Sequence, residues 1–359
     1  MALPTSGPLT LQNIQTEFGG TNPIGLNEYY AGGGLVPAGT SGTNGAVPSS
    51  GAISINNFYG TANFLQLVIS SNTQNFNLLT AAQAAGFVNG SARPIQVTIN
   101  ANIYVWSDST SLAAFDTGAI TGSGTITIIN NGYIIGKGGA GGSNNVGLAG
   151  GNAINLQKSV TITNNSGAFI AGGGGGGGSA RNSGGGYAGG GGGAGGGNGG
   201  AGLQGAGGTG GAVGSAGTDG PGTAGSVWGG GGGGRILPGV GGNGGSVTIP
   251  PNVAAGSVQP GKGGGSGGGG GAGASNNGSP IARGATGGSG GSNNVVGSNG
   301  TQLNSGGAGA GGGGGWGASG GTGSGNSVSF TGGAGGKAVN LNGFTGPITG
   351  SGTVYGAVS

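Results

Sequence analysis

The spacing of hydrophobic and polar positions along the first 61 residues predicts mainly short helices. Apolar residues recur at helical spacing over residues 11–18, directly after Thr10, so this segment predicts a capped helix. A second helical segment is predicted over residues 26–30, and residues 53–60 alternate like a brief strand or a helical turn. Because so short a segment buries little surface alone, we predict that residues 1–61 form a module that docks on a partner.

The alternation is stronger over residues 62–136, where it predicts an α+β domain. Strands are expected where β-branched and aromatic residues cluster, over residues 64–69, 95–99, 103–106 and 125–129. A helix is expected over residues 78–85, capped by Asn77 and ended by Gly86. The turn at residues 130–132 predicts a hairpin-like close to this domain.

Internal repeats accompany a change of pattern after residue 136, where glycine dominates. Residues 160–170 echo residues 125–135 about 35 residues later along the chain. Two shorter motifs also recur, residues 141–146 as 290–295 and residues 120–125 as 348–353. These repeats predict that a structural unit is stacked.

Composition changes this picture, because glycine supplies 110 of the 359 residues and charged residues only 4%. Glycine occurs in runs rather than at every third position, and proline is scarce at 13 residues, which excludes collagen. Disorder stays open as a rival, although disordered chains are usually rich in charge. The absence of cysteine and histidine excludes disulfides and the usual zinc, haem and iron–sulfur sites, so no cofactor is expected. No apolar run is long enough for membrane insertion, and the start lacks the pattern of a secretory signal.

A chain with so few side chains to bury has to be ordered mainly by its backbone. Polyglycine II segments make no internal hydrogen bonds, so their amides are available to neighbouring segments, and only glycine lets such segments pack closely. We therefore predict that residues 137–359 form a packed polyglycine II helix bundle, with the polar and aromatic insertions as turns at its ends. The expected fold class is mixed: an N-terminal module, an α+β domain and this bundle.

A family resemblance rests on residues 125–142, which lead from a β-rich motif into the long glycine runs. This stretch resembles the glycine-rich receptor-recognising proteins of tailed phages, of the T-even type. Residues 9–30 and 52–60 resemble short modules of phage tail and baseplate proteins, although residues 1–60 do not match the adhesins themselves. The resemblance implies a tail-fibre tip adhesin of the virion, made in the host cytoplasm. It also implies attachment to other phage tail proteins through residues 1–61 and recognition of a bacterial outer-membrane protein or lipopolysaccharide.

The insertions between glycine runs are the candidate receptor-binding positions, because exposed aromatic rings and arginines suit recognition of sugars or membrane proteins. The candidates are Arg181, Asn182, Tyr187, Trp228, Arg235, Ile236, Leu237, Asn276, Asn277, Arg283, Asn293, Asn294 and Trp316. An equally weighted alternative is that Trp228 and Trp316 only cover the bundle ends.

Charge divides unevenly along the chain, with a balance of 1 − 4 = −3 over residues 1–136 and 7 − 1 = +6 over residues 137–359. The basic half suits phosphates and acidic sugars, or serves solubility alone, and no dense basic cluster predicts nucleic-acid binding. Asp108 and Asp116 are the one nearby pair of carboxylates, and the sequence has no histidine. Because so few groups could act as catalytic acid and base, a non-enzymatic adhesin is favoured over a glycosidase. A purely structural virion component and a polysaccharide depolymerase stay as alternatives, and a single cap and a homotrimer both stay open.

Overall fold

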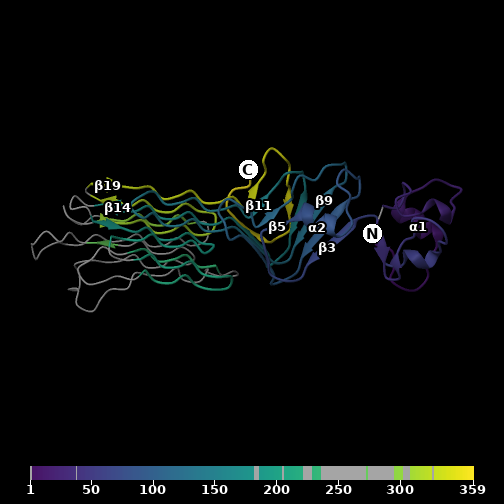
Figure 1. Ribbon diagram of the computed structural model, residues 1–359, viewed down its shortest axis with the longest axis horizontal. Coiled ribbons are helices and arrows are strands. Elements are labelled where there is room, and N and C mark those ends of the chain that lie inside the picture. Colours follow the sequence, from purple (N-terminus) through teal and green to yellow (C-terminus); the bar gives the residue numbers. More distant parts are fainter. Residues whose placement is uncertain are drawn as a thin grey trace, which may run out of the picture.

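A computed structural model of the protein describes residues 2–37, 39–181, 186–203, 206–220, 229–235, 272–273, 295–301, 308–325 and 327–359. The molecule is elongated, and three parts follow one another along its long axis (Figure 1). A small helical part lies at one end, parallel sheets lie in the middle, and the glycine-rich segments extend to the other end. The C-terminus returns to the middle part.

The N-terminal part is built around one aromatic cluster. It contains α1 (Leu11–Phe18), the 3-10 helices η1 (Leu26–Glu28) and η2 (Ile55–Phe58), and the antiparallel pair β1 (Ser41–Gly42) and β2 (Gly45–Ala46). The Thr10 hydroxyl accepts the amide of Asn13, so the predicted cap of α1 is confirmed. The ring of Phe58 lies 6.1 Å from that of Phe18 and 6.2 Å from that of Tyr29, and all three are buried. This cluster gives the N-terminal part a core of its own.

The middle part, called the β body here, is a stack of turns in which the chain visits three parallel sheets in the same order. The first sheet contains β21 (Ile348–Thr349), β12 (Thr161–Asn164), β9 (Ile126–Asn130), β6 (Ile95–Ile99) and β3 (Leu65–Ile69). The second contains β22 (Thr353–Tyr355), β13 (Phe169–Ala171), β10 (Tyr133–Ile135), β7 (Tyr104–Trp106) and β4 (Thr73–Gln74). The third contains β20 (Val339–Asn340), β11 (Ile154–Asn155), β8 (Phe115–Asp116) and β5 (Phe76–Asn77).

Alternation explains why these strands fill one interior. On β6 the side chains of Ile95, Val97 and Ile99 are buried, while the residues between them are partly exposed. The same positions on β9 lie beside them in register, so each turn adds another layer of apolar side chains. The helix α2 (Leu78–Ala84) connects two turns and begins at Asn77, whose side chain accepts the amide of Thr80 as predicted.

The glycine-rich segments are insertions between strands of the β body. The chain leaves after β10 at Gly136 and returns at β11, then leaves after β13 at Gly172 and returns at β20. Two small antiparallel sheets lie within them: β15 (Tyr187–Ala188), β14 (Ala180–Arg181) and β19 (Val328–Ser329), and β16 (Ala272–Gly273), β17 (Ala308–Gly309) and β18 (Ser324–Gly325). Figure 1 places β14 and β19 at the end farthest from α1. We call this part the glycine insertion.

Backbone hydrogen bonds connect the extended segments of the glycine insertion. The buried run 172–178 has neighbouring segments on several sides. Amides that are three residues apart in this run donate hydrogen bonds to the same neighbouring segment. Gly173 and Gly176 donate to carbonyls within residues 148–151. Gly174 and Gly177 donate to carbonyls within residues 191–194, and Gly175 and Gly178 to carbonyls within residues 318–321. These N···O distances are 2.7–2.9 Å, so each amide that leaves water finds a partner.

Close approach of the segments explains why these positions are glycine. A Cβ added to Gly176 would lie 1.9 Å from the carbonyl oxygen of Ala140, and one added to Gly177 would lie 2.1 Å from that of Gly311. The obstructing atoms belong to the backbone, so no side-chain rearrangement makes room. The interior around the run 172–178 is therefore made mainly of peptide groups.

The predicted fold class is wrong. Among the described residues the structure has two α-helices, and its sheets in the β body are parallel, so residues 62–136 are not an α+β domain. The described segments after residue 136 are extended passes and short strands rather than a helix bundle. The hairpin expected over residues 125–135 is also wrong, because β9 and β10 lie in different sheets and pair with strands of neighbouring turns. Alternation located the strands correctly but did not identify their partners.

Candidate functional site

Two of the predicted receptor-binding residues lie side by side at the far end of the glycine insertion. Arg181 on β14 is exposed and pairs in antiparallel register with Tyr187 on β15, which is half-buried. Val328 on β19 pairs with Arg181 from the other side. The three short strands hold a guanidinium and a phenol ring next to each other at the end remote from α1, an arrangement that fits recognition of a polar, partly flat surface.

Arg235 lies elsewhere, where the glycine insertion meets the β body. It is 4% exposed, and its Nε and Nη2 both donate to the carbonyl oxygen of Gly195, at 3.0 and 2.8 Å. Its guanidinium carbon lies 4.9 Å from the ring centre of Trp106 on β7. These contacts connect two parts of the chain and leave little of Arg235 available to a receptor.

Trp316 lies in the same junction and is fully buried. It packs with Tyr133 and Ile135 of β10, Ala171 of β13 and Ala194 of the glycine insertion. Its indole Nε1 is buried without a hydrogen-bond partner among the described residues. Burial of this kind favours the packing alternative for Trp316.

The junction also shifts two pKa values. Burial and, after it, the positive charge of Arg235 together lower the pKa of Lys137 to about 8, and Asp108 partly offsets both effects. The Lys137 ammonium donates to the carbonyl oxygen of Gly196 at 2.7 Å. Burial also lowers the pKa of Arg235 to about 10, again partly offset by Asp108. Two cations thus neighbour each other where the insertion is anchored, each bound to a glycine carbonyl.

The other predicted site residues lie outside the described residues. They are Asn182, Trp228, Ile236, Leu237, Asn276, Asn277, Arg283, Asn293 and Asn294. Their assignment to receptor binding stays a prediction, as does that of Arg181 and Tyr187.

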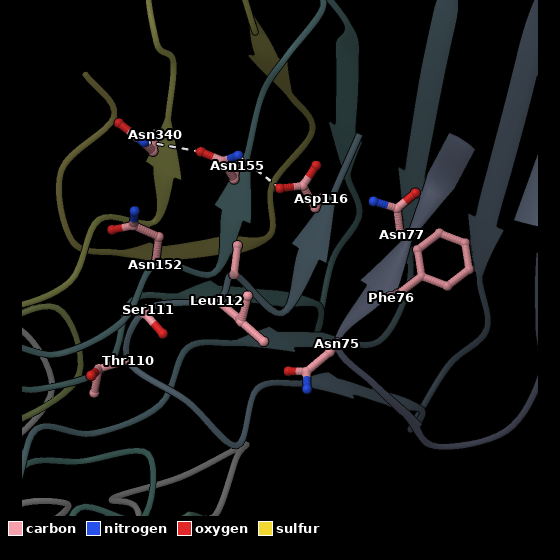
Figure 2. Close-up of a pocket in the computed structure, with 11 residues that line it drawn as sticks. Asn75, Phe76, Asn77, Thr110, Ser111, Leu112, Asp116, Asn152, Asn155 and Asn340 are labelled. Carbon is pink, nitrogen blue, oxygen red and sulfur yellow. Dashed lines mark hydrogen bonds between the residues drawn. The ribbon is translucent and has the colours of Figure 1, made fainter. Parts of the chain in front are cut away.

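A polar pocket in the β body was not predicted from the sequence. It has a volume of about 330 Å³, and Figure 2 shows amide, hydroxyl and apolar side chains around it. The lining residues come from four successive turns: Asn75, Phe76, Asn77, Thr110, Ser111, Leu112, Ala113, Asp116, Asn152, Asn155 and Asn340. A signal existed in the sequence, because Asp116, Asn155 and Asn340 each follow one buried apolar residue of a strand.

The two carboxylates singled out in the sequence are both engaged by amides. Asp116 accepts Nδ2 of Asn155 and Nε2 of Gln157, each at 2.8 Å, on different oxygens. Asp108 is exposed and accepts Nδ2 of Asn75 at 2.7 Å. These contacts give both carboxylates a structural role.

Two other kinds of site are absent from the described part of the chain. None of the helices there has the length and apolar character needed to cross a membrane. No three histidine, cysteine, aspartate or glutamate side chains gather there in a way that suits a metal ion.

A comparison with known protein families points to phage tail fibres. Residues 64–235 match the family described as phage tail fibre adhesin Gp38. A solved structure, the gp37–gp38 adhesin tip complex of the bacteriophage S16 long tail fibre, aligns with a TM-score of 0.44 and 18% identity over 99% of this chain and 100% of the other. No curated protein matches the chain. The family match covers most of the β body and the first part of the glycine insertion, and it confirms the resemblance stated for residues 125–142. It places the protein in the virion tail fibre as an adhesin.

Proposed function

We propose that the protein is a non-enzymatic adhesin that binds a receptor on the bacterial surface through the far end of the glycine insertion. The receptor is an outer-membrane protein or a glycan. One observation carries this proposal: Arg181 and Tyr187 lie paired at the extremity opposite the N-terminal part. Arginine and tyrosine are enriched among residues that dominate binding energies, and here a small sheet fixes them.

The N-terminal part fits the role of an attachment module. Its core, which includes Phe18, Tyr29 and Phe58, is separate from the core of the β body, and it lies at the end away from β14 and β19. We propose that residues 1–61 hold the protein on another tail protein, residues 62–136 connect, and residues 137–359 present the receptor-binding surface. Proteins with this order would expose the glycine insertion to the host.

Adsorption to host cells tests the proposal. Purified protein is expected to bind susceptible cells and to compete with phage particles, and the double variant Arg181→Ala, Tyr187→Ala is expected to bind at least about tenfold more weakly. Lys158→Ala, in the β body, is the control and should bind like the unchanged protein. Binding that survives the double variant would show that the receptor surface lies elsewhere.

The same experiment separates the alternatives. A purely structural tail component would bind neither susceptible nor resistant cells. A depolymerase would release sugar from the host polysaccharide, and the release would depend on Asp116, whose oxygens are occupied by Asn155 and Gln157. We expect no released sugar.

A further inference from the structure

The amide-lined pocket of the β body lies apart from the far end of the glycine insertion. Its walls are the segment that follows β4, the loop before β8, and the strands β8, β11 and β20 (Figure 2). A volume of about 330 Å³ is within the range of sites for small ligands, which starts near about 300 Å³. The pocket therefore has room for a ligand of its own.

One wall of the pocket is a fixed ladder of side chains. Asn155 donates to Asp116 at 2.8 Å, and Asn340 donates to Oδ1 of Asn155 at 3.0 Å, as the dashed lines in Figure 2 show. Asn342 donates to the same Asn155 oxygen at 2.8 Å. Because Asp116, Asn155 and Asn340 stand on neighbouring strands in register, their side chains are oriented before any ligand arrives. Pre-orientation of this kind lowers the entropic cost of binding.

Other groups around the pocket keep hydrogen-bonding capacity. Oδ1 of Asn152 accepts the amide of Lys337 at 2.9 Å, and its Nδ2 has no partner among the described residues. Oδ1 of Asn77 caps α2, and its Nδ2 is likewise unpaired within the described chain. The hydroxyl residues Thr110 and Ser111 also line the pocket. The pocket thus offers amide donors and hydroxyls, which suit ligand hydroxyl groups because a hydroxyl both donates and accepts.

Charge and shape narrow the class of ligand. No lysine or arginine lines the pocket, and both oxygens of its one carboxylate, Asp116, already accept hydrogen bonds. An anionic ligand would therefore find no opposite charge there, and a cationic ligand would meet only a carboxylate whose two oxygens are already engaged by amides. Leu112 is 51% exposed and Phe76 is half-buried, so the polar groups are flanked by apolar surface. Hydroxyl groups around an apolar C–H face are the pattern of an uncharged sugar ring.

We propose that this pocket is a second binding site, which takes a neutral saccharide. It is separate from the surface at Arg181 and Tyr187. Contact through the β body would add to that at the far end, and two linked contacts bind a surface more tightly than either alone. Sugar binding in the pocket and receptor binding at Arg181 and Tyr187 can therefore be tested separately.

Calorimetric titration of the full chain tests this inference. The probes are neutral hexoses, N-acetylhexosamines and their disaccharides at up to about 10 mM, with glucuronic acid as a charged comparison. At least one neutral sugar is expected to bind. Leu112→Arg places a long charged side chain at the pocket and should abolish binding. Leu148→Arg is the matched control, since Leu148 is 53% exposed and lies in the glycine insertion. It should bind like the unchanged chain.

A second variant tests the donor role of Asn152. Asn152→Asp keeps the oxygen that accepts the amide of Lys337 but replaces the Nδ2 donor, and we expect the affinity to fall about tenfold. Thermal melting checks that the variants stay folded. Absence of binding by every neutral sugar overturns the inference, and so does binding that persists in Leu112→Arg or that favours glucuronic acid. Host-cell adsorption by Leu112→Arg is measured in parallel and reports on the far end alone.

Discussion

The β body and the glycine insertion both stack extended segments, but different atoms fill their interiors. In the β body, buried side chains such as Ile128 meet between the three sheets. In the glycine insertion, buried residues such as Gly176 bring peptide groups together, with N···O distances near 2.8 Å to several neighbours. The first interior tolerates apolar residues of similar size, whereas the second leaves no room for one added carbon. Rigidity in one part thus comes from side-chain burial and in the other from backbone hydrogen bonds.

The largest expected effect is the loss of stability when one methyl group is added to the interior of the glycine insertion. Gly176→Ala places Cβ 1.9 Å from the Ala140 oxygen, so the segments have to separate, at a cost of several kcal/mol. Gly346→Ala is the control, because Gly346 is also buried but its nearest obstacle is a flexible methyl group of Leu156 at 2.9 Å. Limited proteolysis should cut the glycine insertion in Gly176→Ala only. Equal resistance of the two variants would contradict the comparison.

Removal of a buried side chain probes the β body in the opposite way. Ile128 is 0% exposed within the apolar core, and Ile128→Ala should destabilise the β body by about 2–5 kcal/mol. Val68→Ala serves as control, since Val68 is 53% exposed on β3. Chemical unfolding followed by circular dichroism measures both. A loss for Ile128→Ala no larger than for Val68→Ala would show that side-chain burial does not hold this part.

The junction between the two parts should respond by a smaller amount. Arg235→Met removes two hydrogen bonds to the Gly195 carbonyl and the contact with Trp106, which together are expected to cost about 1.5–3 kcal/mol. Arg181→Met, at the exposed far end, should change stability by less than about 0.5 kcal/mol. Thermal melting compares them. If Arg181→Met destabilised the protein as much as Arg235→Met, the anchoring role of Arg235 would be wrong.

The smallest expected effect is a change with pH in the stability that the same junction contributes. Burial lowers the pKa of Lys137 from its ordinary value of 10.5 to about 8, so the folded chain binds fewer protons than the unfolded chain between these values. Stability should therefore rise as the pH is raised from about 8 toward 10.5, while below pH 8 the contribution stays constant. Lys137→Met should flatten this rise in Tm. A Tm that falls equally in both proteins over this interval would contradict the assignment.

The sequence predicted local elements of the fold well, because local signals specify them. Thr10 and Asn77 marked the starts of α1 and α2, and alternation marked β3, β6 and β7. It did not predict the sheet partners, since each strand pairs with a strand of the next turn, which is distant in sequence and, for β11 and β20, lies beyond the whole second glycine segment. The echo of residues 125–135 in residues 160–170 held that information: Tyr133 and Phe169 are partners in register.

The candidate site was predicted less well, for reasons of burial and chain path. An arginine or tryptophan between glycine runs has the same local pattern whether it ends exposed, like Arg181, or buried, like Trp316. Whether such a residue is exposed or buried depends on whether the folded chain brings it next to the β body. The pocket was missed because its asparagines come from separate turns, where asparagine is usually interpreted as a turn former.

Amide hydrogen exchange over residues 172–178 in the intact protein tests most directly whether backbone hydrogen bonds hold the glycine insertion. We expect these amides to exchange at least about a thousandfold more slowly than in an unfolded chain, as slowly as those of β9 and β10 in the β body. Exchange of residues 172–178 at the unfolded rate, with β9 and β10 still protected, would contradict the account.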